Sequence, residues 1–145
     1  MKRKQPQSLG FTLVELMVVL VIIAVSAALV TLALPNSDGT LLAREAERLA
    51  ALLESARAQS RAAGVPVIWH TTERGFAFDG LPPLAEPMPG NWLDAHTTAA
   101  ASAPLLLGPE PVIGAQQVLL RRAGSNQLLR VGTDGLRPFV VEPVQ

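Results

Sequence analysis

The chain has 145 residues, with 12 basic and 12 acidic side chains that give a formal net charge of zero. This balance does not suggest a nucleic-acid-binding protein, and the length suits one compact soluble domain beside a short N-terminal region. The absence of cysteine excludes disulfide bonds, thiol catalysis and zinc–thiolate sites. An exported domain of this composition must therefore fold without covalent cross-links.

The first predicted element is an apolar helix over residues 11–34, in which Glu15 is the only formal charge. As a helix this run extends about 36 Å, which is enough to cross a bilayer. Residues 1–10 carry the basic cluster Lys-Arg-Lys at 2–4, and the positive-inside rule keeps such a cluster cytoplasmic. We therefore predict a single membrane span with a cytoplasmic N-terminus and the remaining chain on the opposite side. An acidic side chain inside such a span costs about 2.5 to 3.5 kcal/mol, so Glu15 requires a partner.

A glycine, a phenylalanine and a carboxylate stand where the basic leader meets this helix: Gly10, Phe11 and Glu15. In this context they resemble the processing site of type IV pilin-like precursors, which include the pseudopilins of type II secretion. The resemblance implies that a prepilin peptidase cuts after Gly10 and methylates the new amino group of Phe11. It also implies an assembly role for Glu15, close in depth to the amino-terminal charge at Phe11 of a neighbouring subunit.

Three other interpretations of this segment stay open. In the first, Glu15 is a residue that snorkels to the membrane face. In the other two, the whole segment is either a cleaved secretory signal or an uncleaved signal anchor. A secretory signal has an apolar core of about 7 to 15 residues followed by a small-x-small site, and residues 24–26 and 26–28 offer such sites. Neither kind of signal accounts for Gly10 together with Glu15.

Residues 35–40 are rich in helix breakers and capping residues, which predicts a break or a bend at Pro35 and a cap at Asp38 or Thr40. A second helix should follow and end at Gly64. Small and apolar residues recur along it every three or four positions and are expected to pack on a sheet. They are Leu42, Ala46, Leu49, Leu53, Ala56, Ser60 and Ala63. The charged residues are expected to face solvent or neighbouring subunits. They are Arg44, Glu45, Glu47, Arg48, Glu54, Arg57 and Arg61.

From residue 65 onward the apolar pattern has a period of two, which predicts strands. Residues 65–71 and 76–79 should form a hairpin. Residues 81–104 are rich in proline and are predicted to form an ordered loop anchored by Trp92, which could contact partners. Short strands are expected at 118–121, 128–131 and 138–141.

These elements predict an α+β fold, with a long N-terminal helix packed on an antiparallel, β-rich C-terminal domain. The expected organisation is a leader at 1–10, a membrane and filament-core helix at 11–34, a kink and stalk helix at 35–64, and a β-rich domain at 65–145.

The second half is similar to H-type minor pseudopilins and to the related minor pilins FimT and FimU. The similarity rests on Ala56-Arg57 ahead of residues 64–67, on Trp92, and on the turn at 133–135 before Pro138. It implies a minor pseudopilin of the type II secretion system, a structural subunit near the pseudopilus tip that supports export of folded proteins. The implied location is the bacterial inner membrane with a periplasmic domain, then the pseudopilus. The implied partners are the prepilin peptidase, other major and minor pseudopilins and the inner-membrane assembly platform. A minor pilin of a type IV pilus and a periplasmic domain on an uncleaved signal anchor are the alternatives.

The sequence does not predict an enzyme. Asp94 and His96 beside several serines suggest part of a hydrolytic triad, but no Gly-x-Ser-x-Gly elbow is present. His70 is expected to be a partly buried strand residue. No phosphate loop, dinucleotide fingerprint or EF-hand pattern occurs, so Asp79 and Asp134 are interpreted as turn residues. We expect no catalytic, cofactor-binding or metal-binding residue.

Overall fold

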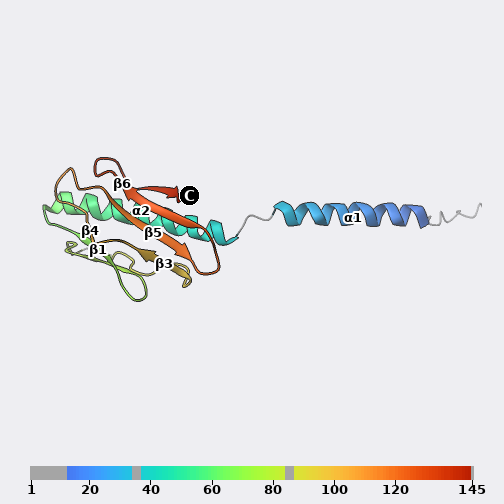
Figure 1. Ribbon diagram of the computed structural model, residues 1–145, viewed down its shortest axis with the longest axis horizontal. Coiled ribbons are helices and arrows are strands. Elements are labelled where there is room, and N and C mark those ends of the chain that lie inside the picture. The colour runs from blue at the N-terminus through green and yellow to red at the C-terminus, as the bar shows by residue number, and fades with distance from the viewer. Residues whose placement is uncertain (1–12, 34–36, 84–86, 145) are drawn as a thin grey trace, which may run out of the picture. The chain divides into compact units, whose positions relative to one another are not determined.

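The computed structural model describes residues 13–33, 37–83 and 87–144 (Figure 1). The chain divides into two compact units, Met1–Pro35 and Asn36–Gln145. The first unit contains helix α1, and the second contains helix α2 and all the described strands. Each unit is described by itself.

Helix α1 spans Leu13–Ala33 and is apolar around its whole circumference. Every described side chain from Leu13 to Ser26 is exposed. The membrane span predicted for residues 11–34 begins and ends outside the described residues, and so does the predicted break at Pro35. Within the ranges that the structure describes, no helix combines the length and the apolar character that crossing a membrane requires.

Helix α2 spans Ser37–Ala63, and the chain leaves it through Gly64, which has a φ of 67°. This left-handed conformation is where glycine ends helices, so the predicted end of the helix is confirmed. The helix begins at Ser37, so Asp38 and Thr40 lie within its first turn, and the prediction that one of them precedes the helix as its cap was wrong.

The small and apolar side chains of α2 face the core almost as predicted. Six of the seven are completely buried: Leu42, Ala46, Leu49, Leu53, Ala56 and Ser60. Ala63 is exposed because it is the last residue of the helix. The charged face differs from the prediction, since Glu45 and Arg57 are each only 2% exposed. Loops from distant parts of the chain cover both side chains and bind them, as described below.

The strands form two antiparallel sheets. One has the order β2-β1-β4, and the other has the order β3-β5-β6-β7. Their bounds are β1 Ile68–Thr71, β2 Phe76–Asp79, β3 Thr97–Ala100, β4 Leu105–Leu106, β5 Gln116–Arg122, β6 Leu128–Thr133 and β7 Val140–Pro143. Helix α2 packs against β5, β6 and β7. The α+β prediction with antiparallel sheets is confirmed, and this architecture is consistent with a pilin-like fold.

The hairpin of β1 and β2 is confirmed, with Trp69 opposite Phe78. The prediction of a loop over residues 81–104 was wrong in part, because it contains β3. Trp92 does anchor this region, since its ring packs on Phe76 with 4.7 Å between the ring centroids.

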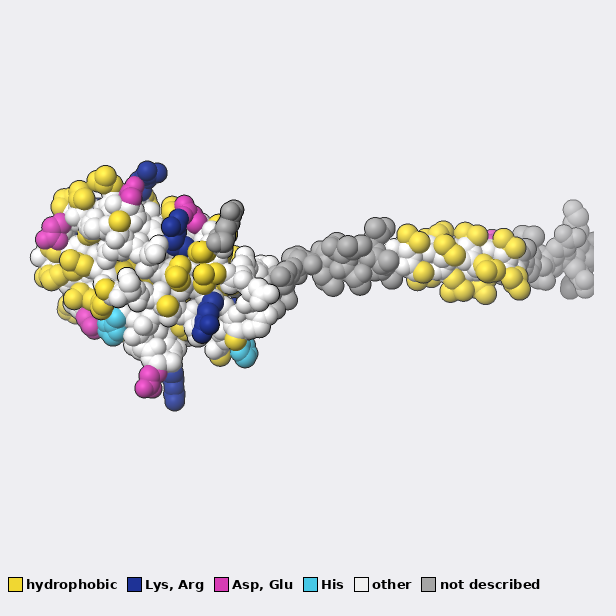
Figure 2. All heavy atoms as spheres, viewed as in Figure 1, with side chains coloured by type: hydrophobic (Ala, Val, Ile, Leu, Met, Phe, Trp, Pro, Cys, Tyr) yellow, Lys and Arg dark blue, Asp and Glu magenta, His cyan; other side chains and the backbone are white. Residues whose placement is uncertain are grey.

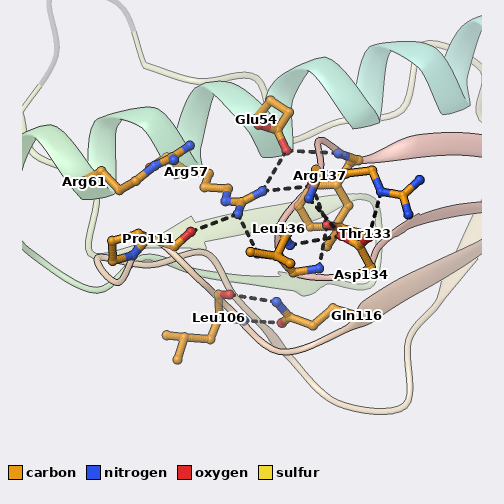
Figure 3. A network of polar contacts seen from close by, with 12 residues as sticks. Glu54, Arg57, Arg61, Leu106, Pro111, Gln116, Thr133, Asp134, Leu136 and Arg137 are labelled. Atoms are coloured by element: carbon orange, nitrogen blue, oxygen red, sulfur yellow. Dashed lines mark hydrogen bonds and ion pairs between the residues drawn. The ribbon is translucent and has the colours of Figure 1, made fainter.

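A side chain covers the outer edge of β4. The Gln116 carboxamide accepts a hydrogen bond from the Leu106 N–H at 2.7 Å and donates one to the Leu106 carbonyl at 2.9 Å (Figure 3). Gln116 is the first residue of β5, so this amide pair also joins the two sheets. It satisfies the main-chain groups that an edge strand otherwise leaves open to another strand.

Candidate functional site

Glu15 lies in the first turn of α1, and its side chain is exposed. A carboxylate in the first turn of a helix interacts favourably with the positive end of the helix dipole. Gly10 and Phe11, the other two residues that the sequence singles out, lie outside the described residues. The structure therefore places Glu15 at the start of an apolar helix.

The surface of α1 around Glu15 has no polar side. Large apolar side chains with exposed fractions between 41% and 75% occur at successive positions along its described part: Leu13, Val14, Leu16, Met17, Val18, Val19, Leu20, Val21, Ile22, Ile23 and Val25. Figure 2 shows them covering the visible face of that segment. A helix that is apolar all round is stable when other helices or lipid cover it. Association is therefore the physical role that this surface supports.

The second unit holds a polar network centred on the buried side chain of Arg57 (Figure 3). Its guanidinium donates hydrogen bonds to the carbonyls of Gly135 at 2.8 Å, Arg137 at 3.1 Å and Pro111 at 3.3 Å. It also lies 3.4 Å from a carboxylate oxygen of Glu54, one helical turn earlier. One side chain of α2 thus holds two loops that are far apart in the sequence.

Acidic residues complete this network at the turn between β6 and β7. Glu54 accepts a hydrogen bond from the N–H of Phe139 at 3.0 Å. Asp134 accepts hydrogen bonds from the N–H groups of Arg137 at 2.8 Å and Leu136 at 3.0 Å. These two hydrogen bonds, from Arg137 first and then Leu136, lower the pKa of the Asp134 carboxyl below its ordinary value, and the charge of Arg137 adds to the effect. Asp134 is a turn residue, as predicted.

A second buried charge, Glu45, performs the same task nearer the start of α2. One oxygen of Glu45 accepts a hydrogen bond from the N–H of Leu93 at 2.7 Å, and the other lies 2.9 Å from Arg48. Arg48 in turn donates to the carbonyl of Asn91 at 3.0 Å. Sequence periodicity assigned Glu45 and Arg57 to the exposed face of the helix, whereas both side chains are buried. The only local signal is that each follows or precedes an oppositely charged residue at a spacing of three.

Asp94, one of the two residues considered for hydrolytic chemistry, has Arg122 as its charged side-chain partner. Asp94 forms an ion pair with Arg122 at 2.5 Å and accepts a hydrogen bond from the main-chain N–H of His96 at 3.3 Å. Desolvation raises the pKa of the Asp94 carboxyl, but the hydrogen bonds from Arg122 and His96 and their charges outweigh it and lower this pKa below its ordinary value. His70 bonds through Nε2 to Asp79 at 3.0 Å on the surface of the β1–β2 hairpin, where it is partly exposed.

Metal ligands do not converge in the part of the chain that the structure describes: no group of three His, Cys, Asp or Glu side chains there could hold a metal ion. The networks around Arg57 and Glu45 bind main-chain groups of loops. The surface of α1 exposes apolar side chains that another helix or lipid could cover.

Comparison with known proteins identifies the N-terminal segment. Residues 6–31 match the family model described as the prokaryotic N-terminal methylation motif. No curated protein and no solved structure matches the chain.

The matched motif is the substrate signal of prepilin peptidases, and it supports a type IV pilin-like or pseudopilin function. It implies a membrane-anchored, pilin-like N-terminus and pilin-like assembly partners, and the family that carries it is structural.

Proposed function

We propose that this chain is a minor pseudopilin of the type II secretion system, a structural subunit near the pseudopilus tip that supports export of folded proteins. The observation that carries the proposal is the methylation motif at residues 6–31, which continues into the apolar helix α1. A segment of this kind serves a subunit that waits in a membrane and then joins a helical bundle.

Processing comes first in the proposed sequence of events. The prepilin peptidase cuts after Gly10, where the missing side chain lets the main chain approach a protease closely. The cut produces an amino group on Phe11, which the same enzyme methylates. The mature subunit then begins with a positive charge a few residues before the carboxylate of Glu15.

Assembly then uses this pair of charges. In the inner membrane the N-terminus is cytoplasmic, because residues 2–4 are basic, and the second unit is periplasmic. The assembly platform moves the subunit into the filament, where contacts between apolar helices replace contacts with lipid. The ammonium group of one subunit and Glu15 of its neighbour then select the register between helices, a role for which buried charges are well suited even when their net stabilisation is small.

The second unit supports the assignment to the H-type subfamily. Its likeness to that subfamily includes Ala56-Arg57 and the turn at 133–135, and in the structure Arg57 binds the carbonyl of Gly135 in this turn. Two parts of the likeness, Arg57 and the turn at 133–135, are therefore in direct contact. Trp92, the third part of the likeness, anchors its loop on Phe76.

The alternatives are a minor pilin of a type IV pilus and a periplasmic domain on an uncleaved anchor. Neighbouring genes for a secretion ATPase and an outer-membrane secretin favour the secretion machine, and a gene for a retraction ATPase favours the pilus. The uncleaved anchor needs neither processing nor Glu15.

The substitution Glu15→Ala tests the proposal in the native host. We expect the variant to be inserted and processed but to support neither secretion nor filament assembly, because its helix lacks the charge that selects the register. Glu47→Ala is the control, since Glu47 is an exposed glutamate of α2 in the second unit. Normal secretion and normal assembly with Glu15→Ala would refute the assembly role and favour the anchor.

A further inference from the structure

Two exposed aliphatic residues lie on adjacent loops that meet the C-terminal part of α2. Leu136 is 71% exposed and Val112 is 58% exposed. Their loops touch, because the N–H of Ile113 donates a hydrogen bond to the carbonyl of Gly135 at 3.2 Å. We call Val112 and Leu136 the loop patch. Figure 2 shows hydrophobic side chains gathered at the end of the second unit where α2 finishes.

The loop patch is held in place by the most buried cation of this unit. Arg57 binds the carbonyl of Pro111, directly before Val112, and the carbonyls of Gly135 and Arg137 on both sides of Leu136 (Figure 3). Burying a charge is costly unless it is well paired, so its position between these loops needs an explanation. A surface that is already ordered loses little conformational entropy when it binds a partner.

We propose that the loop patch is the surface through which this subunit contacts the head of a neighbouring pilin-like subunit in the filament. This inference rests on the proposed function and adds the position of the contact. Leu136 and Val112 supply the apolar centre of this contact, and the charged residues around them form its rim.

The charges around the patch favour a protein over a nucleic acid or an anionic lipid surface. Exposed residues of both signs lie close to it in the sequence or in the network. They are Arg61, Glu110, Asp134 and Arg137. Two positive and two negative groups give no net attraction for a polyanion, whereas a rim of mixed charges around an apolar centre is typical of protein interfaces.

The small area of the loop patch is sufficient if the partner is a neighbouring subunit of the same filament. Two aliphatic side chains are too few for a stable complex between free domains. Within a filament the helices already hold neighbouring subunits together, so the second contact is intramolecular in effect and needs little intrinsic affinity. A weak patch thus suffices to set the position of one head against the next.

The absence of cysteine allows a direct test in the native host. Leu136→Cys, labelled with a photoactivatable maleimide, places a crosslinker in the loop patch of the full chain. Leu93→Cys is the matched control, because Leu93 is 68% exposed and its main chain is also held by a buried charge, Glu45. We expect the Leu136 position to crosslink to a pilin-like subunit with a processed N-terminus and the Leu93 position to give much less of this product, because only the Leu136 position lies in the proposed contact.

The inference is wrong if the two positions crosslink equally, if the Leu136 position gives no crosslink, or if it reacts only with lipid or with a protein that has no processed N-terminus. Leu136→Asp should lower about tenfold the amount of the same pilin-like subunit that is recovered together with the full chain. Leu93→Asp should leave this amount unchanged. If Leu136→Asp fails to fold, Val112→Asp and the cysteine label decide.

The N-terminal mass of the labelled chain separates the two proposals. A chain that still begins at Met1 overturns both the proposed function and the loop patch. A chain that begins at Phe11 and assembles normally with Leu136→Asp overturns the loop patch alone.

Discussion

Replacing Arg57 by methionine tests whether this side chain holds two loops on α2. The guanidinium is 2% exposed and binds three carbonyls and Glu54. Removing one partner of a buried ionic group costs about 3 to 5 kcal/mol. We expect the lower end, about 3 kcal/mol, because Glu54 is 29% exposed and two of the four contacts are 3.3 Å or longer.

Both tryptophans of the chain, Trp69 and Trp92, lie in the second unit, so tryptophan fluorescence reports the unfolding of that unit in the full chain in detergent. A loss of about 3 kcal/mol lowers Tm by about 12 °C for a domain of this size. Arg61→Met is the control, since Arg61 is exposed and its described contact is a 3.4 Å bond to the Arg57 carbonyl. Equal, small effects of the two substitutions, under about 1 kcal/mol, would refute the reasoning.

Two further predictions concern the turn that Arg57 binds. Gly135→Ala should prevent native packing of this turn, because Gly135 has a φ of 94° and an added Cβ would lie 1.8 Å from the Ile113 carbonyl oxygen; Gly114→Ala, whose added Cβ meets nothing within 4 Å, should leave Tm nearly unchanged, and equal Tm values would contradict this. The lowered pKa of Asp134 means that its carboxylate stabilises the fold at pH values above the unfolded pKa near 3.8, and this contribution is lost as the pH falls through the lower folded pKa. Asp134→Asn keeps an acceptor for the turn but loses the charge, so its Tm deficit should shrink as the pH falls toward 3, and a deficit independent of pH would contradict the assignment.

Local patterns in the sequence predicted the parts of the fold that depend on local spacing. The buried side of α2 follows from residues three and four apart, and Gly64 marks its end because glycine adopts a left-handed conformation easily. The hairpin of β1 and β2 follows from alternation in residues 65–79. Strand β3 was missed because its sequence, Thr-Thr-Ala-Ala, has small side chains and no apolar alternation.

Local patterns could not predict the contacts that hold the loops in place. Arg57 and Gly135 are 78 residues apart in the chain, and Glu45 and Leu93 are 48 residues apart. A charged side chain on a helix is usually solvated, so periodicity assigns it to the surface. Burial of Glu45 and Arg57 depends on loops that fold over them, and no local signal specifies where those loops lie.

The candidate site at the N-terminus, in contrast, depends on residues that are close together in the sequence. Gly10, Phe11 and Glu15 form a short local motif, and the match to residues 6–31 was found from sequence alone. The structure adds that Glu15 lies in the first turn of a helix whose other described side chains are almost all apolar and exposed. The roles of these three residues stay a prediction.

The most direct measurement is the intact mass and N-terminal sequence of the membrane-extracted chain from cells that contain a prepilin peptidase. Our account predicts a chain that begins at methylated Phe11. A chain that still begins at Met1 would contradict the account and indicate an uncleaved anchor, and one that begins after Ser26 or Ala28 would indicate an ordinary secreted domain.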